Sequence, residues 1–268
     1  MIDALPRYEP EPLSNTPLAL VVAQIQFPPV LSIQTDDKAL ARFQDLLRDR
    51  YPYLSIGQQI GINIGPQGVE PQGPPAGRIY QFTDADRAWV VSLTVESVAL
   101  EARSYTDYAD FSDRVLRLID TVKEVYRIQM RQRVGLRYIN EIRHPDVSAI
   151  NDWTSLLRHE LLGLVARDDF GPLIRSSLQE LSLDLPNGRL TIRHGYLSQG
   201  TTVAPLPGDA PKDEGPFYLL DFDAFDEQVR DLEDHTLDEL LQSYNHTMFQ
   251  LFRWLVQDRL YDYLKGDS

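Results

Sequence analysis

Four stretches in the first half of the chain predict strands. The first is rich in β-branched and apolar residues and ends at Pro28-Pro29, and the second and third resemble a hairpin around residues 83–87. Along the fourth, apolar and polar side chains alternate, as they do in a strand whose side chains point to opposite faces. The four stretches are residues 18–27, 78–82, 88–96 and 98–103. Apolar side chains recur at helical spacing over residues 37–50 and 107–125, which predicts two helices. Thr35 or Asp36 is suited to cap the first helix, and Asp107 the second. Residues 51–78, with six Gly and five Pro, predict a long loop around a short central strand.

The second half repeats this order of elements. Its first strand, over residues 131–143, stops at Pro145, just as the strand at 18–27 stops at Pro28. Asn151 or Asp152 opens a helix, and two of the later strands flank Asn187-Gly188, the preferred dipeptide of a type I′ hairpin turn. The remaining predicted elements are strands at 177–185, 189–197 and 217–223 and a long helix at 236–264.

The repeated order predicts an internal duplication. Each half is expected to form a β-α-β-β-β-α unit, over about residues 18–128 and 131–264, and the opening strands align without gaps at 18–28 and 135–145. Two such units predict an α+β fold with an antiparallel sheet and long helices on one face. This arrangement resembles the TBP-like, helix-grip class of folds. We therefore expect residues 1–268 to form a single pseudo-symmetric domain.

The strand at 131–143 also predicts what the sheet shows on its uncovered side. Val134, Leu136, Tyr138 and Ile142 suit the core, so the intervening charged residues point to the other face. Either these charges form cross-strand ion pairs on a solvated sheet, or they line a concave surface that binds a polar ligand or a peptide. The predicted binding face comprises Glu101, Arg103, Arg133, Arg137, Asn140, Glu141, Arg143 and Arg193.

Charge is distributed unevenly along the chain. The protein has 26 Lys and Arg against 40 Asp and Glu, which gives a net charge of −14. Twelve of the acids fall in residues 209–239, whereas residues 128–143 are locally basic. The acidic segment is either a solvated loop and helix start or a docking surface for a basic protein partner. Its best-placed carboxylates are Asp221, Asp223, Asp226 and Glu227, and Asp221 and Asp223 are also a weak Mg²⁺ candidate.

Composition excludes several classes of chemistry. The chain has no cysteine, which removes disulfides, thiolate metal sites and cysteine nucleophiles. Its five histidines lack the spacing of a helical zinc site, and neither a phosphate-binding glycine loop nor a serine nucleophile elbow occurs. We therefore expect no cofactor. The overall acidity disfavours broad nucleic-acid binding, and the absence of a long apolar run predicts a soluble, cytoplasmic protein without a membrane partner.

Two motifs carry a family resemblance. Residues 12–31 contain P-L-x-N-x-P-L and end in F-P-P-V-L, and residues 135–140 read G-L-R-Y-I-N. With these motifs the chain resembles a sporadically distributed family of uncharacterised bacterial proteins of matching length. The resemblance implies an association with mobile or defence-type gene neighbourhoods and makes Arg137 and Asn140 the polar residues most worth testing. It implies no activity or cofactor.

Three functions are compatible with these observations. The first is a non-enzymatic binding or regulatory module of a bacterial operon, with a protein partner and with self-association as an option. The second is an enzyme, acting on a small molecule or dependent on Mg²⁺, with a pocket between the sheet and the long helices. The third is an acidic mimic of nucleic acid.

Overall fold

A nine-stranded antiparallel sheet organises the part of the chain that the structure describes. The structure is a computed structural model, and it describes residues 5–58, 61–65, 68–72, 77–198, 215–232 and 236–266. The strands of the sheet are β1 (Leu18–Gln26), β2 (Tyr53–Gln58), β5 (Arg78–Thr83), β6 (Trp89–Leu93), β7 (Ser97–Ala102), β9 (Arg133–Ile142), β10 (Gln179–Leu185), β11 (Gly188–Leu197) and β12 (Phe217–Asp226). The short pairs are β3 (Gly61–Gly65) with β4 (Gly68–Gln72) and β8 (Met130–Arg131) with β13 (Arg230–Asp231).

The strand order reads β10-β11-β12-β9-β1-β7-β6-β5-β2, with β1 and β9 paired at the centre. Outward from this pair, β7, β6 and β5 follow in decreasing order on one side, and β12, β11 and β10 do so on the other. Each half therefore adds its last strand next to its first. All the pairings in the sheet are antiparallel, as the sequence predicts.

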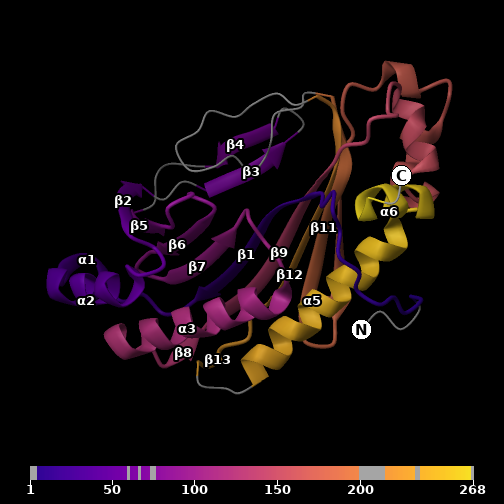
Figure 1. Ribbon diagram of the computed structural model, residues 1–268. Coiled ribbons are helices and arrows are strands. Elements are labelled where there is room, and N and C mark those ends of the chain that lie inside the picture. The colour runs from indigo at the N-terminus through magenta and orange to yellow at the C-terminus, as the bar shows by residue number, and fades with distance from the viewer. Residues whose placement is uncertain are drawn as a thin grey trace.

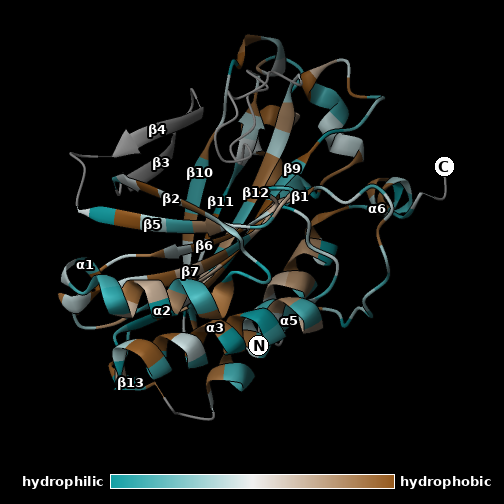
Figure 2. Ribbon diagram, turned by 60° about the vertical axis from the view of Figure 1, so that its left-hand side comes forward, coloured by the Kyte–Doolittle hydropathy of each residue, from teal (hydrophilic) through white to brown (hydrophobic). Residues whose placement is uncertain are grey.

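Helices cover one face of the sheet (Figure 1). They are α1 (Ser32–Thr35), α2 (Asp37–Leu47), α3 (Tyr108–Tyr126), α4 (His159–Leu162), α5 (Thr236–Leu255) and α6 (Asp258–Lys265), with 3₁₀ turns at Ile150–Ser155, Gly163–Ala166 and Gly171–Leu173. Figure 2 shows that α2, α3 and α5 are amphipathic, with hydrophobic and hydrophilic stretches side by side. Their apolar faces pack on β7, β9 and β12 and on one another. Among the described residues, no helix has both the length and the apolar character needed to span a membrane.

The predicted helix starts rest on identifiable caps. The Asp36 carboxylate accepts hydrogen bonds from the backbone N–H groups of Lys38 and Ala39 and opens α2. The Asp107 carboxylate accepts from the N–H of Asp110 and opens α3. Each cap satisfies N–H groups that have no partner inside the helix, so the sequence locates both starts correctly.

Two predicted helices are interrupted for a common reason. The helix expected from Asn151 breaks into short turns, and the helix expected to reach Leu264 divides into α5 and α6. At the two breaks, the Arg158 N–H donates to the Leu255 carbonyl at 2.9 Å, and the Gln257 N–H donates to the Leu156 carbonyl at 2.8 Å. These backbone groups bond across the chain and are lost to their own helices, so a tertiary contact overrides the local helical pattern.

Two other predictions are corrected. β2 lies within the stretch expected to be a long loop and forms the ninth strand at the sheet edge. The β10–β11 turn contains Pro186 and Asn187, because Leu185 pairs with Gly188. Proline holds φ negative, so this turn cannot be type I′, and the positive φ of 125° falls on Gly188 at the start of β11.

Gly188 gives a test of this corrected turn. A Cβ at this position would lie 2.1 Å from the Phe225 carbonyl oxygen, on a backbone that side chains rarely adopt. We expect Gly188→Ala to lower the free energy of unfolding by about 1–3 kcal/mol in urea denaturation. Gly57→Ala is the control, because its Cβ would meet only Ile79 at 3.5 Å. Equal stability of the two variants would contradict this account of the turn.

Candidate functional site: a polar sheet face and a partly open pocket

The face of the sheet opposite the helices carries a network of ion pairs. Alternation places Arg133, Arg137 and Glu141 of β9 on this face, and Glu101 and Arg193 join them from β7 and β11. Arg103 and Arg143 follow the ends of their strands and pair with Glu101 and Glu141. Asn140 is the exception in the predicted binding face. Its even position on β9 turns it toward the helices, so the sheet parity corrects that assignment.

Asp221 is the centre of this network. Its carboxylate accepts hydrogen bonds from Nε and Nη2 of Arg137, both at 2.7 Å, and lies 3.5 Å from Nη1 of Arg193. The Asp221 side chain is fully buried, and Arg193 also pairs with Glu180 at 2.7 Å. Burial opposes the charge of Arg137, but the hydrogen bonds and charge of Asp221 outweigh it and raise the pKa of the guanidinium.

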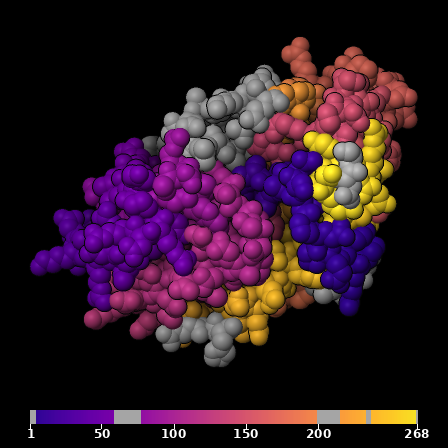
Figure 3. All heavy atoms as spheres, viewed as in Figure 1, coloured from indigo at the N-terminus to yellow at the C-terminus, as the bar shows by residue number. Residues whose placement is uncertain are grey.

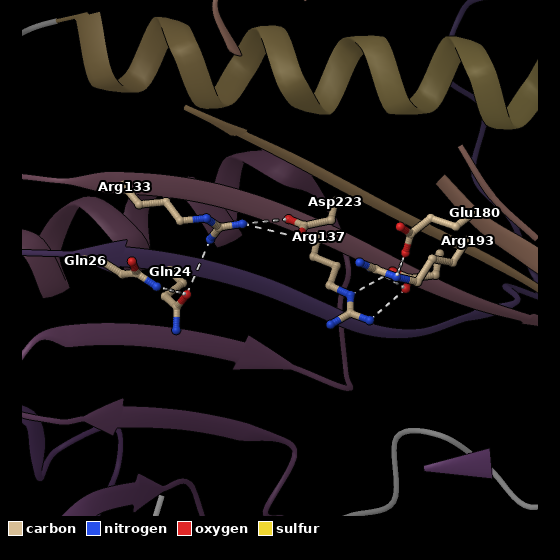
Figure 4. A network of polar contacts seen from close by, with 8 residues as sticks. Gln24, Gln26, Arg133, Arg137, Glu180, Arg193 and Asp223 are labelled. Carbon is tan, nitrogen blue, oxygen red and sulfur yellow. Dashed lines mark hydrogen bonds and ion pairs between the residues drawn. The ribbon is translucent and has the colours of Figure 1, made fainter. Parts of the chain in front are cut away.

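A looser cluster lies beside it, as Figure 4 shows. Arg133 donates to both carboxylate oxygens of Asp223 at 3.3–3.4 Å and to the Gln24 side chain at 3.4 Å. Gln26 donates to Gln24, and the Arg133 guanidinium stacks 4.6 Å above the Phe225 ring. Burial raises the pKa of Asp223, while Arg133 and Arg137 act in the opposite direction. The longer distances indicate a weaker pair than Arg137 with Asp221.

The four carboxylates of the predicted docking surface lie in three environments. Asp221 and Asp223 belong to the ion network, where arginines neutralise them. Asp226 is buried on the helix side and lies 3.5 Å from Arg230, whereas Glu227 is exposed beyond the end of β12. Asp209, Asp213, Glu214, Glu233 and Asp234 lie outside the described residues. Within the described ranges, no three side chains of the His, Asp or Glu type are grouped in a way that could hold a metal ion.

The two aspartates of the network give a matched test. Asp221→Asn leaves two arginine charges without their buried partner, and we expect it to cost about 3–5 kcal/mol of unfolding free energy. Asp223→Asn is expected to cost about 1 kcal/mol, because burial already disfavours the charge of Asp223 and its hydrogen bonds are long. Urea denaturation of both variants measures the difference. Similar losses would show that Asp221 does not hold the network together.

On the helix side, a cavity of about 600 Å³ lies between the sheet and α5. Its floor includes Tyr138 and Asn140 of β9 and Phe222 of β12. One wall is α5, and the opposite wall is the loop between β7 and α3. The lining side chains are Pro10, Glu11, Pro12, Leu13, Thr16, Pro17, Leu18, Tyr105, Thr106, Asp107, Tyr108, Tyr138, Asn140, Phe222, Asn245, His246, Met248, Phe249 and Phe252.

An extended N-terminal arm, residues 5–17, closes a further side of this cavity. In Figures 1 and 3 the arm lies against the C-terminal helices α5 and α6. The Gln250 side chain bonds the arm twice, since its Oε1 accepts from the Tyr8 N–H at 2.7 Å and its Nε2 donates to the Tyr8 carbonyl at 2.8 Å. Asn15 donates from its backbone and side chain to the carbonyls of Leu264 and Tyr263. The arm is therefore held to the last two helices at both of its ends.

Four uncharged polar side chains of the cavity, those of Tyr105, Tyr138, Asn140 and Asn245, are joined to hydrogen-bond partners. The Tyr138 hydroxyl donates to the Asn245 side-chain oxygen at 2.8 Å and lies 3.5 Å from the Tyr105 hydroxyl. Nδ2 of Asn140 donates to the Leu220 carbonyl at 3.0 Å. Burial raises the pKa of Tyr138 well above its ordinary value and also raises that of Tyr105. Both phenols therefore keep their protons at neutral pH.

The two sequence motifs meet at this cavity. Pro12, Leu13 and Pro17 of the first motif line it, and so do Tyr138 and Asn140 of the second. The pairing of β1 with β9 brings them together, because Leu18 lies opposite Asn140 and the Glu141 N–H donates to the Pro17 carbonyl. Sequence analysis singled out Asn140 but missed Tyr105, Asn245 and Phe249. The sequence pattern that could have identified Asn245 and Phe249 is their position next to the apolar residues Tyr244 and Met248 of α5.

No family model matches the chain, and no curated protein matches it. The resemblance of the two motifs to a bacterial family therefore stays a prediction, and the functional assignment rests on the geometry of the cavity.

Gln250 tests whether the arm depends on its two side-chain bonds. We expect Gln250→Leu to speed hydrogen exchange of the backbone amides in residues 5–17 by about thirtyfold, since two hydrogen bonds of roughly 1 kcal/mol each are lost. Exchange measured by mass spectrometry checks it. Gln242→Leu, at an exposed position of the same helix, is the control. An arm that exchanges no faster in Gln250→Leu than in Gln242→Leu would contradict this role.

Proposed function

We propose that this protein is a non-enzymatic binding module that holds a small organic molecule in the cavity between the sheet and α5. The observation that carries the proposal is the cavity itself, bordered by the N-terminal arm, the β7–α3 loop, the sheet and α5 and partly open to solvent. Its volume of about 600 Å³ falls within the range typical of small-molecule sites. Its lining joins apolar and aromatic walls to a few polar groups, which is the usual composition of such sites.

The polar groups of the cavity are suited to orient a ligand. Asn245 accepts from Tyr138 through its oxygen, so its Nδ2 is left to donate. Asn140 donates to Leu220 through its nitrogen, so its oxygen is left to accept. The raised pKa of Tyr138 makes this phenol a poor base. The geometry thus favours recognition of a ligand over proton transfer to it, which supports binding in preference to the enzyme hypothesis.

The same proposal includes the internal duplication. The matching order of strands outward from β1 and β9 supports two β-α-β-β-β-α units in the TBP-like, helix-grip arrangement. Long helices that lie across a sheet in this arrangement leave a space between the two layers, and the cavity occupies such a space. A regulatory role in a bacterial operon, docking of a basic partner and mimicry of nucleic acid stay predictions.

A blocked cavity tests the proposal. Thr106 is exposed at the rim, so Thr106→Trp is expected to fill the entrance without disturbing the core. A fragment library is screened by thermal shift. A ligand at a hundred times its Kd stabilises the folded state by about 2.7 kcal/mol, which raises Tm by several degrees.

The matched control is Thr35→Trp, an exposed threonine on α1, remote from the cavity. We expect ligands that stabilise the parent protein and Thr35→Trp but not Thr106→Trp. A library without such ligands, or ligands that stabilise all three proteins equally, would overturn the proposed function.

A further inference from the structure

The charges around the cavity are of one sign. Glu11 and Asp107 are its two carboxylates, and no Lys or Arg is among the described residues that line it. Two bases of the last two helices, Lys265 and Arg253, are each engaged with other groups of the chain. Lys265 pairs with Asp262 at 3.3 Å and with Glu11 at 3.9 Å, and Arg253 lies 3.9 Å above the Tyr261 ring. The positive charge of Lys265 partly offsets the negative charge of Glu11, so Asp107 contributes most of the negative charge at the cavity.

Asp107 retains capacity for a ligand. Its Oδ1 accepts the N–H of Asp110 as the cap of α3, and Oδ2 takes no hydrogen bond from the described residues. The side chain is exposed, next to Thr106 at the rim. A positive group placed at this rim would meet a carboxylate with a free oxygen, whereas a negative group would meet repulsion. The net charge of −14 acts in the same direction at longer range.

The walls of the cavity suit a cation as well. Six aromatic rings line it, from the β7–α3 loop, β9, β12, α3 and α5: Tyr105, Tyr138, Phe222, Tyr108, Phe249 and Phe252. The face of an aromatic ring is electron-rich and attracts an ammonium group, and this attraction strengthens where water is excluded. The same ring faces repel an anion, and no Lys or Arg among the described lining residues could neutralise it. Aromatic walls and an acidic rim are two independent features that select the same class of ligand.

We infer that the ligand is an organic cation, an amine or a quaternary ammonium compound with an apolar body; this inference rests on the proposed function. The buried and exposed ends of the cavity determine how the ligand is oriented. Phe222 and Met248 are almost fully buried, so the apolar body lies at their end. The ammonium group lies at the rim beside Asp107, near Tyr105 of the β7–α3 loop and Tyr108 at the start of α3.

Three probes of similar size distinguish the ligand classes: phenethylamine, phenethyl alcohol and phenylacetate. We expect ligand-observed NMR titration to give an affinity for the amine about tenfold higher than for the alcohol, with no detectable binding of phenylacetate. In Asp107→Asn, which keeps the helix cap, the preference for the amine is expected to fall severalfold. Asp120→Asn is the control, since it removes one exposed charge from the same helix away from the cavity.

The outcomes separate the two proposals. Binding of the alcohol or of phenylacetate at least as tight as the amine, with loss of binding in Thr106→Trp, overturns the cationic class and leaves the proposed function standing. If the preference for the amine falls equally in Asp107→Asn and Asp120→Asn, the preference arises from the net negative charge of the whole protein. That outcome overturns the ammonium site at the rim. Failure of all three probes overturns the cationic class, while the library screen against Thr106→Trp decides the proposed function separately.

Discussion

The antiparallel pairing of β1 with β9 is the constraint on which the other parts depend. It joins two segments more than a hundred residues apart, with Gln26 opposite Arg133 at one end and Leu18 opposite Asn140 at the other. The remaining strands of each half add outward from this pair, and the helices then cover the face on which Val21, Leu136 and their neighbours form the core. A slip of one residue in this register would move the side chains of the slipped strand to the opposite face of the sheet. Register therefore decides the position of both the ion network and the cavity.

Adjacent residues of one strand have different roles because their side chains lie on opposite faces of the sheet. On β12, Asp221 points to one face and meets Arg137, while Phe222 points to the other and lines the cavity. A buried ion pair is costly to desolvate and gives little net stability, so its value lies in fixing geometry. Arg137 can pair with Asp221 at 2.7 Å only when β9 and β12 are in register. The network on one face thus specifies the alignment that places Tyr138 and Asn140 on the other.

Local patterns predicted the strands and the helix starts well because their causes are local. Alternation assigned the two faces of β9, and Asp36 and Asp107 marked the beginnings of α2 and α3. Errors arose where distant segments compete for the same backbone groups, as at Leu156–Arg158 and the end of α5. The burial of Asp221 and the cavity were likewise beyond prediction, since both require side chains from strands whose neighbours are set by topology. Asn140 was assigned to the polar face with the rest of its motif, although its even position in the strand already favoured the helix side, where the structure places it.

The hydrogen bonds between the N-terminal arm and helices α5 and α6 have a consequence for the order in which the protein folds during synthesis. Asn15 bonds the carbonyls of Tyr263 and Leu264, contacts that span 248 residues of sequence or more. During synthesis the arm is made well before α5 and α6, the helices that hold it. The sheet can begin to assemble around β1 before then, but the arm lacks its partners until α6 has been made. The arm can therefore complete its side of the cavity only after α6 has been synthesised.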